Sequence, residues 1–96
     1  MGWTVVLANR AGKQVKRLPA RIRESVEFLS YNLAETGPAQ PAWPHYGKIR
    51  GRADCHHCHI QRGRPTYVAI WRELPGRSIE VTYVGTHEGA DYQRLC

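Results

Sequence analysis

The spacing of apolar residues changes along the chain, and each change predicts a different element. The segment Trp3–Ala8 is a short, β-branched apolar run, which predicts a strand. Next, four apolar residues recur at steps of four and three, which places them on one face of a helix: Ile22, Val26, Leu29 and Leu33. Phe28 and Tyr31 lie beside this stripe and could widen it. From Tyr46 onward the period becomes two, as in strands.

The helical part of the chain is predicted to contain two helices, over Arg10–Leu18 and Ala20–Thr36. The first is short and basic. Pro19 stands between the two, at a position where helices often begin. Gly37 followed by Pro38 ends the second helix, because glycine favours the helix C-terminus and proline cannot continue the helix. The two helices therefore form a hairpin that follows the first strand.

The second half of the chain predicts a small sheet. The stretch Gly37–Pro44 contains three prolines and is expected to be an ordered connector anchored by Trp43. Three strands follow it, over His56–Gln61, Thr66–Leu74 and Ile79–Thr86. The predicted fold class is α+β: an N-terminal strand, a two-helix hairpin, then an antiparallel twisted sheet with the helices on one side. All four strands are expected to be antiparallel in one sheet.

Size and charge restrict the class of protein. The 96 residues suit one domain, 1–96, and the hydrophobic content of 42% is ordinary for a folded chain. The formal net charge of +6 favours a polyanionic partner such as RNA. We find no apolar run long enough to span a membrane and no signal peptide. A cytoplasmic location without membrane attachment is the expectation.

The three cysteines invite a metal hypothesis. Cys55 and Cys58 have the CxxC spacing of zinc ligands, but a structural zinc site needs four ligands, and the chain has no second pair of this kind. His87 or Cys96 would have to serve as distant ligands. On a strand, Cys55 and Cys58 point to opposite faces, so we predict no metal and place Cys58 in the core. The odd cysteine count argues against a disulfide scaffold and favours reduced thiols.

Histidines and arginines gather in the predicted sheet. On the first of its strands His57 and His59 share one face with Gln61. Two imidazoles beside arginines suit proton transfer on a phosphodiester, although histidines on a half-exposed sheet are often only solvated. The candidate arginines lie in the following turn and at the end of the next strand: Arg62, Arg64 and Arg72.

Two further segments carry candidate residues. Lys48, Arg50 and Arg52 alternate before the histidine run, which suits either a basic ridge for RNA or an edge strand guarded by charge. His87 follows the last predicted strand, and Tyr92 comes soon after it. Imidazole and phenol are proton-transfer groups, but a polar C-terminal tail is also commonly solvated and frayed. The sequence leaves both alternatives open.

Several motifs make the chain resemble the RelE-like toxins of bacterial toxin–antitoxin pairs, closest to the cytotoxic translational repressors. They are the His57–Cys58–His59 run, GRPTYVAIW from Gly63 to Trp71, and VGTHEGADY from Val84 to Tyr92. The helical hairpin also fits, as do RLP at 17–19 and GP at 37–38. Together these segments cover nearly the whole chain, and the two later motifs are the specific ones.

The resemblance implies a microbial RNase fold and a type II toxin that cuts mRNA, often in the ribosomal A site, without a metal or other cofactor. It implies three partners: a cognate antitoxin, mRNA and the ribosome. Carried over residue by residue, it places the site at His57, His59, Arg62, Arg72, His87 and Tyr92.

Elementary chemistry agrees with this expectation. RNA carries its own nucleophile, the 2′-hydroxyl, so the protein has to supply a base, an acid and a cation. Histidines and arginines suffice for these roles. Two alternatives remain open: a non-catalytic module that binds RNA or the ribosome through its basic charge, and a zinc-stabilised interaction domain.

Overall fold

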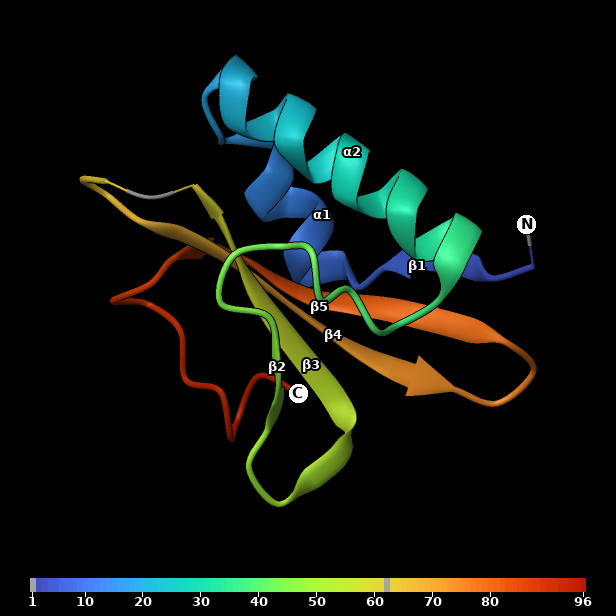
Figure 1. The fold of residues 1–96 in the computed structure, drawn as a ribbon. Helices are drawn as coiled ribbons and strands as arrows, with labels where there is room; N and C mark the ends of the chain where they lie inside the picture. Colours follow the sequence, from blue (N-terminus) through green and yellow to red (C-terminus); the bar gives the residue numbers. More distant parts are fainter. Residues whose placement is uncertain (1, 62) are drawn as a thin grey trace.

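Five strands form one twisted sheet, and both helices cover the same face of it (Figure 1). The structure is a computed structural model that describes residues 2–61 and 63–96. In chain order the elements are β1 (Thr4–Leu7), α1 (Asn9–Lys16), α2 (Ala20–Thr36), β2 (Gly47–Ile49), β3 (Arg52–Gln61), β4 (Tyr67–Leu74) and β5 (Ser78–Thr86). The predicted α+β class is confirmed, and β2 is an additional short strand.

The direction of β1 is the main correction to the predicted fold. The strand order is β1-β5-β4-β3-β2, and the pairs from β2 to β5 are antiparallel as expected. However, β1 pairs with β5 in parallel, with Thr4 opposite Ser78. Tight turns force neighbouring strands to run antiparallel, whereas β1 reaches β5 through the helices and the rest of the sheet. Its direction is therefore free of any hairpin constraint.

The helices follow the predicted pattern closely. The bounds of α2 are those predicted, with Pro19 as its N-cap, while α1 begins one residue earlier and ends two residues earlier than expected. The four stripe residues of α2 are at most 4% exposed and pack against the sheet: Ile22, Val26, Leu29 and Leu33. The periodicity of the sequence thus identifies the buried face of this helix.

Phe28 and Tyr31 do not widen the buried stripe, an option that the sequence had left open. They are 60% and 63% exposed. Each lies on the outer flank of α2, because Leu29 and Leu33 already fill the space against the sheet. The Phe28 ring instead contacts Trp43 of the connector, with ring centroids 5.8 Å apart.

Two substitutions on α2 should separate buried from exposed apolar residues. Leu29→Ala should lower the free energy of unfolding by about 2–5 kcal/mol, because it leaves a cavity in the core. Phe28→Ala should cost less than about 1 kcal/mol, since its ring is largely in solvent. Urea denaturation of both variants measures the difference. Equal losses would contradict the assignment of the buried face.

The second face of the sheet, which we call the open face, carries a smaller apolar cluster covered by the C-terminal tail, residues 87–96. Five residues of the sheet region meet Leu95 of the tail there: Ile49, Cys55, Val68, Ile70 and Tyr83. Leu95 is only 7% exposed, so the tail is packed and not frayed. Among the described residues no helix is long and apolar enough to cross a membrane.

The cysteines differ from the reduced state that the sequence favoured. Cys55 and Cys96 form a disulfide with their Cα atoms 6.1 Å apart. The odd count of three cysteines gave no indication of this pair. The two residues are 41 positions apart in sequence, and they meet only because the tail folds back onto the sheet. Cys58 is free and fully buried on the helix side, as predicted.

Candidate functional site

Strand alternation in β3 sorts its histidines onto two faces, as the sequence predicted. His56 is 1% exposed and lies on the helix side together with Cys58 and Ile60. His57 and His59 point to the open face, where they meet residues from outside β3. The open face therefore holds the titratable groups that solvent and a ligand can reach.

Four imidazoles and a phenol form one cluster on the open face. The rings of His59 and His45 stack with centroids 4.2 Å apart, and His59 meets His87 edge-on at 5.5 Å. Tyr92 of the tail lies 4.9 Å from His57 and 6.3 Å from His87. The structure thus brings together four residues that the sequence predicted for the site: His57, His59, His87 and Tyr92.

His45 belongs to this cluster although sequence reasoning did not select it. It directly follows the connector Gly37–Pro44, and its φ of 55° lies in the left-handed region that residues other than glycine seldom adopt. The His59 N–H donates to the Pro44 carbonyl oxygen at 2.8 Å, so the backbone just before His45 is tied to β3. No local pattern reveals this neighbour, because the connector's path is set by tertiary contacts.

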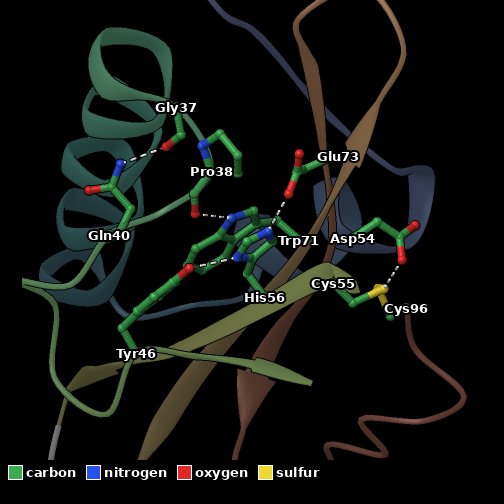
Figure 2. A network of polar contacts seen from close by, with 10 residues as sticks. All are labelled: Gly37, Pro38, Gln40, Tyr46, Asp54, Cys55, His56, Trp71, Glu73 and Cys96. Atoms are coloured by element: carbon green, nitrogen blue, oxygen red, sulfur yellow. Dashed lines mark hydrogen bonds and ion pairs between the residues drawn. A yellow bond between two sulfur atoms is a disulfide. The ribbon is translucent and has the colours of Figure 1, made fainter. Parts of the chain in front are cut away.

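A polar network on the helix side holds the connector in place (Figure 2). Trp71 of β4 donates its Nε1–H to the Pro38 carbonyl oxygen at 2.9 Å. The Tyr46 hydroxyl lies 2.7 Å from Nδ1 of His56, whose Nε2 lies 2.8 Å from a carboxylate oxygen of Glu73. The His56 and Trp71 rings are nearly parallel, 4° apart in plane. His56 is therefore a buried structural residue that indirectly supports the open face.

The electrostatics of the cluster favour an uncharged His57. Burial lowers the pKa of His57, and the nearby charges of His45, His56 and His87 lower it further. Its Nδ1 is buried and has no hydrogen-bond partner among the described residues. An imidazole in this state can accept a proton at neutral pH.

Tyr92 is held in its protonated form. Burial raises the pKa of Tyr92, and Coulombic interactions with Cys58 and Tyr83 act in the same direction. The phenol therefore keeps its O–H near neutral pH and can donate a hydrogen bond to a ligand.

The predicted basic residues do not form one ridge. Lys48 and Arg50 line a pocket of about 170 Å³ together with His57, Tyr92 and Gln93. Arg52 instead points to the tail and donates to the carbonyl oxygens of Gln93 and Cys96, each at 3.4 Å. A bulge between Lys48 and Ile49 and the turn before β3 break the alternation on which the ridge depended.

Two of the remaining predicted arginines have described positions, in the β3–β4 turn and within β4. Arg64 is exposed in the turn between β3 and β4, while Arg62 lies outside the described residues. Arg72 stands opposite Cys55, and its Nε lies 2.9 Å from a carboxylate oxygen of Glu80. This ion pair occupies part of the guanidinium. Along β4, Arg72 lies two residues from Ile70, which stands opposite His57 of β3.

The donor set does not suit zinc held by the CxxC pair. Cys55 is joined to Cys96 on the open face, while Cys58 lies in the helix-side core. Within residues 2–61 and 63–96, no three His, Cys, Asp or Glu side chains are grouped closely enough to hold a metal ion.

The fold is that of the RelE toxins. The structure of a free Escherichia coli RelE toxin, a double arginine-to-alanine mutant, is similar with a TM-score of 0.77 and 21% identity, over 99% of this chain and 94% of that chain. Two toxin–antitoxin complexes are also similar. They are RelBE2 from Mycobacterium tuberculosis (TM-score 0.66, 18% identity, 91% of this chain and 100% of that chain) and RelE–RelB from Pyrococcus horikoshii (0.63, 14%, 94% and 100%).

Sequence comparison gives no closer relative. No protein-family model matches the chain, and no curated protein sequence matches it significantly. The structural similarity therefore establishes the fold, and the function has to be inferred from the open-face cluster.

Proposed function

We propose that this protein is the toxin of a type II toxin–antitoxin system and that it cleaves mRNA. The observation that carries the proposal is the cluster of imidazoles on the open face, next to a pocket lined by Lys48 and Arg50. An RNA phosphodiester needs both proton transfer and cationic contacts, and this part of the surface supplies both. The RelE-like fold supports the same conclusion.

The proposed reaction begins with the 2′-hydroxyl of RNA. His57 is the candidate base, because its lowered pKa keeps the imidazole neutral at pH 7. Removal of the 2′-proton lets the oxygen attack the adjacent phosphorus. His87, which is exposed, is the candidate acid that protonates the leaving 5′-oxygen. The products would then end in a 2′,3′-cyclic phosphate.

The other predicted residues take supporting roles. Tyr92 donates a hydrogen bond to a nucleotide or stacks on its base, and His59 positions His87 through the edge-on ring contact. Lys48 and Arg50, which line the pocket, hold the phosphate backbone, and Arg62 and Arg64 remain predicted RNA contacts. Arg72 joins them when a phosphate competes with Glu80 for its guanidinium.

The proposed partners follow from the same fold and charge. The similar complexes from other organisms hold a toxin with its antitoxin, which supports a cognate antitoxin for this chain as well. The net charge of +6 suits mRNA and the ribosome as the setting of cleavage in the cytoplasm. All of the proposed steps use side chains of this chain and need no metal.

Induced expression tests this function. The wild-type protein should arrest growth and shorten mRNA, because cleavage destroys the templates of translation. The new 5′-ends should map within coding regions. A His57→Gln, His87→Gln double variant expressed to the same level is the control and should permit growth.

Other outcomes of this experiment separate the alternatives. Growth arrest with intact mRNA in both the wild type and the double variant would favour the non-catalytic module that binds RNA or the ribosome. Normal growth with folded wild-type protein and unchanged mRNA would contradict the toxin proposal.

A further inference from the structure

The C-terminal tail brings Tyr92 to the site and is anchored at both ends. At its start, the His87 N–H donates to the Thr66 carbonyl oxygen at 2.8 Å. At its end, Cys96 is bonded to Cys55 of β3. Tyr92 lies between these anchors, with its ring on His57. The position of Tyr92 therefore depends on both anchors.

The polar contacts between the end of the tail and the sheet region are few. Arg52 reaches the Gln93 and Cys96 carbonyl oxygens only at 3.4 Å, and the side-chain amide of Gln93 donates to the Arg50 carbonyl oxygen at 3.1 Å. Within the tail, which the structure describes completely, Leu95 is the only buried residue. These bonds are long or solvent-exposed and contribute little to stability, so the disulfide and the packing of Leu95 are the main restraints on this segment.

The two cysteines of the pair differ in exposure. Cys55 is 0% exposed, whereas Cys96 is only partly buried. An external thiolate can therefore approach Cys96 more easily than Cys55. Figure 2 shows Cys96 beside Cys55 and Asp54 at the end of the sheet.

The third cysteine cannot compete for this bond. Cys58 is 0% exposed on the opposite face of the sheet, and burial raises the pKa of its thiol to about 12. It therefore stays protonated and out of reach, so that Cys55 and Cys96 have only each other as partners within the chain.

We propose that Cys55 and Cys96 form a thiol–disulfide exchange site, whose oxidation state decides whether the tail holds Tyr92 against His57. The oxidised state keeps the site assembled, and reduction releases the end of the tail. The movement of the tail is independent of the reaction catalysed, whereas the control of RNA cleavage rests on the proposed ribonuclease function. Within reducing compartments, the disulfides that form are usually transient and either catalytic or redox-sensing.

The exchange is a two-electron reaction with a thiol of the glutathione class. A thiolate attacks the Cys96 sulfur, forms a mixed disulfide there and breaks the bond to Cys55, which leaves as a thiolate and takes up a proton. A second thiolate attacks the outer sulfur of the mixed disulfide and releases the Cys96 thiolate. The two small thiols are oxidised to their disulfide, and the protein gains two thiols.

Reduction gives Cys55 a thiol hydrogen that can make one further hydrogen bond. Cys55 Sγ lies 3.6 Å from Oδ1 of Asp54. A disulfide sulfur carries no hydrogen, so this contact becomes a hydrogen bond only when the Cys55 thiol is present. The Cys55 side chain can thus remain in place after reduction, while Cys96 and the end of the tail move away.

The experiment follows the tail in mixtures of reduced and oxidised glutathione. Thiol alkylation and mass measurement should show Cys55 and Cys96 converting between disulfide and dithiol while the domain stays folded. Amide hydrogen exchange over residues 92–96 should become at least about tenfold faster on reduction, and exchange in β4 should not change. The His57 ring resonances should shift as Tyr92 leaves. RNA cleavage should fall at least about tenfold.

Two variants provide matched controls. Cys96→Ser should behave like the reduced protein in every glutathione mixture, and Cys58→Ala should respond like the wild type. Should Cys96→Ser fold poorly, the reduced wild-type protein supplies the same comparison.

Three results would overturn the proposal. In the first, Cys55 and Cys96 react with glutathione only after the domain unfolds. In the second, the amides of residues 92–96 are equally protected in the oxidised and reduced states. In the third, the tail is released and the rate of RNA cleavage does not change. A protein that cleaves no RNA in either state would refute the ribonuclease function, and the exchange and resonance measurements would still decide whether the tail is controlled.

Discussion

Replacing His57 with Gln is expected to lower the rate of RNA cleavage by about 10²–10⁴-fold, the usual contribution of one proton-transfer group. Glutamine keeps the polarity of the position and much of its size, but it cannot take up a proton. RNA affinity should change little, because it depends on the lysine and arginine side chains around the site. His87→Gln should cause a loss of at least about a hundredfold for the same reason.

The pH dependence of the wild-type rate adds a second readout for His57. A base works only when it is unprotonated, and the pKa of His57 lies below the usual 6.5. Cleavage should therefore persist as the pH falls through 6.5 and decline only at lower pH. In His57→Gln, the small remaining activity should no longer show this decline at low pH.

The measurement is cleavage of a labelled mRNA in a ribosome-containing assay, at saturating and at limiting RNA concentrations. Glu88→Gln is a suitable control, since it alters the exposed residue next to His87 without removing an imidazole, and it should stay within about threefold of the wild type. Normal cleavage by folded His57→Gln protein would show that this imidazole is not the base.

The parts of the structure that the sequence predicted are those set by local periodicity. The stripe on α2 is spaced so that one face of any helix over these residues must be apolar, and the sheet buries that face. Alternation in β3 likewise separates His57 and His59 from His56 and Cys58, whatever the neighbouring strands are. Such features need no knowledge of long-range contacts.

The features that the sequence could not predict depend on residues that meet only after folding. His45 reaches His59 because the connector is held by Trp71 and His56 from the far side of the sheet. Cys96 reaches Cys55 because the tail folds back over the open face. The parallel direction of β1 has the same origin, since no turn links it to β5.

The arginines illustrate a different limit. A run of basic residues predicts attraction for RNA, but it does not show which guanidinium groups are already used within the protein. Arg72 is paired with Glu80, and Arg52 bonds to tail carbonyl oxygens, whereas Lys48 and Arg50 line the pocket beside His57. The partner of each cation is decided by the register of the strands, which a single bulge can change.

Trp71→Ala is expected to cause the largest loss of stability among simple core substitutions, about 3–5 kcal/mol. Trp71 is 0% exposed, stacks on His56 and Tyr46, and donates to the Pro38 carbonyl oxygen. Alanine leaves a cavity and an acceptor without its partner. A domain of this size has about 5–15 kcal/mol of total stability, so much of the protein should unfold at moderate temperature.

Urea denaturation followed by far-ultraviolet circular dichroism measures this loss, and Trp71→Phe separates its two causes. Phenylalanine preserves most of the ring packing and removes only the indole N–H, so it should cost about 1–3 kcal/mol. Because the lost bond anchors the connector, the His45 ring resonances should shift in Trp71→Phe although His45 lies on the other face of the sheet. Unchanged His45 resonances, or a cost below about 1 kcal/mol for Trp71→Ala, would mean that the connector is held by other contacts.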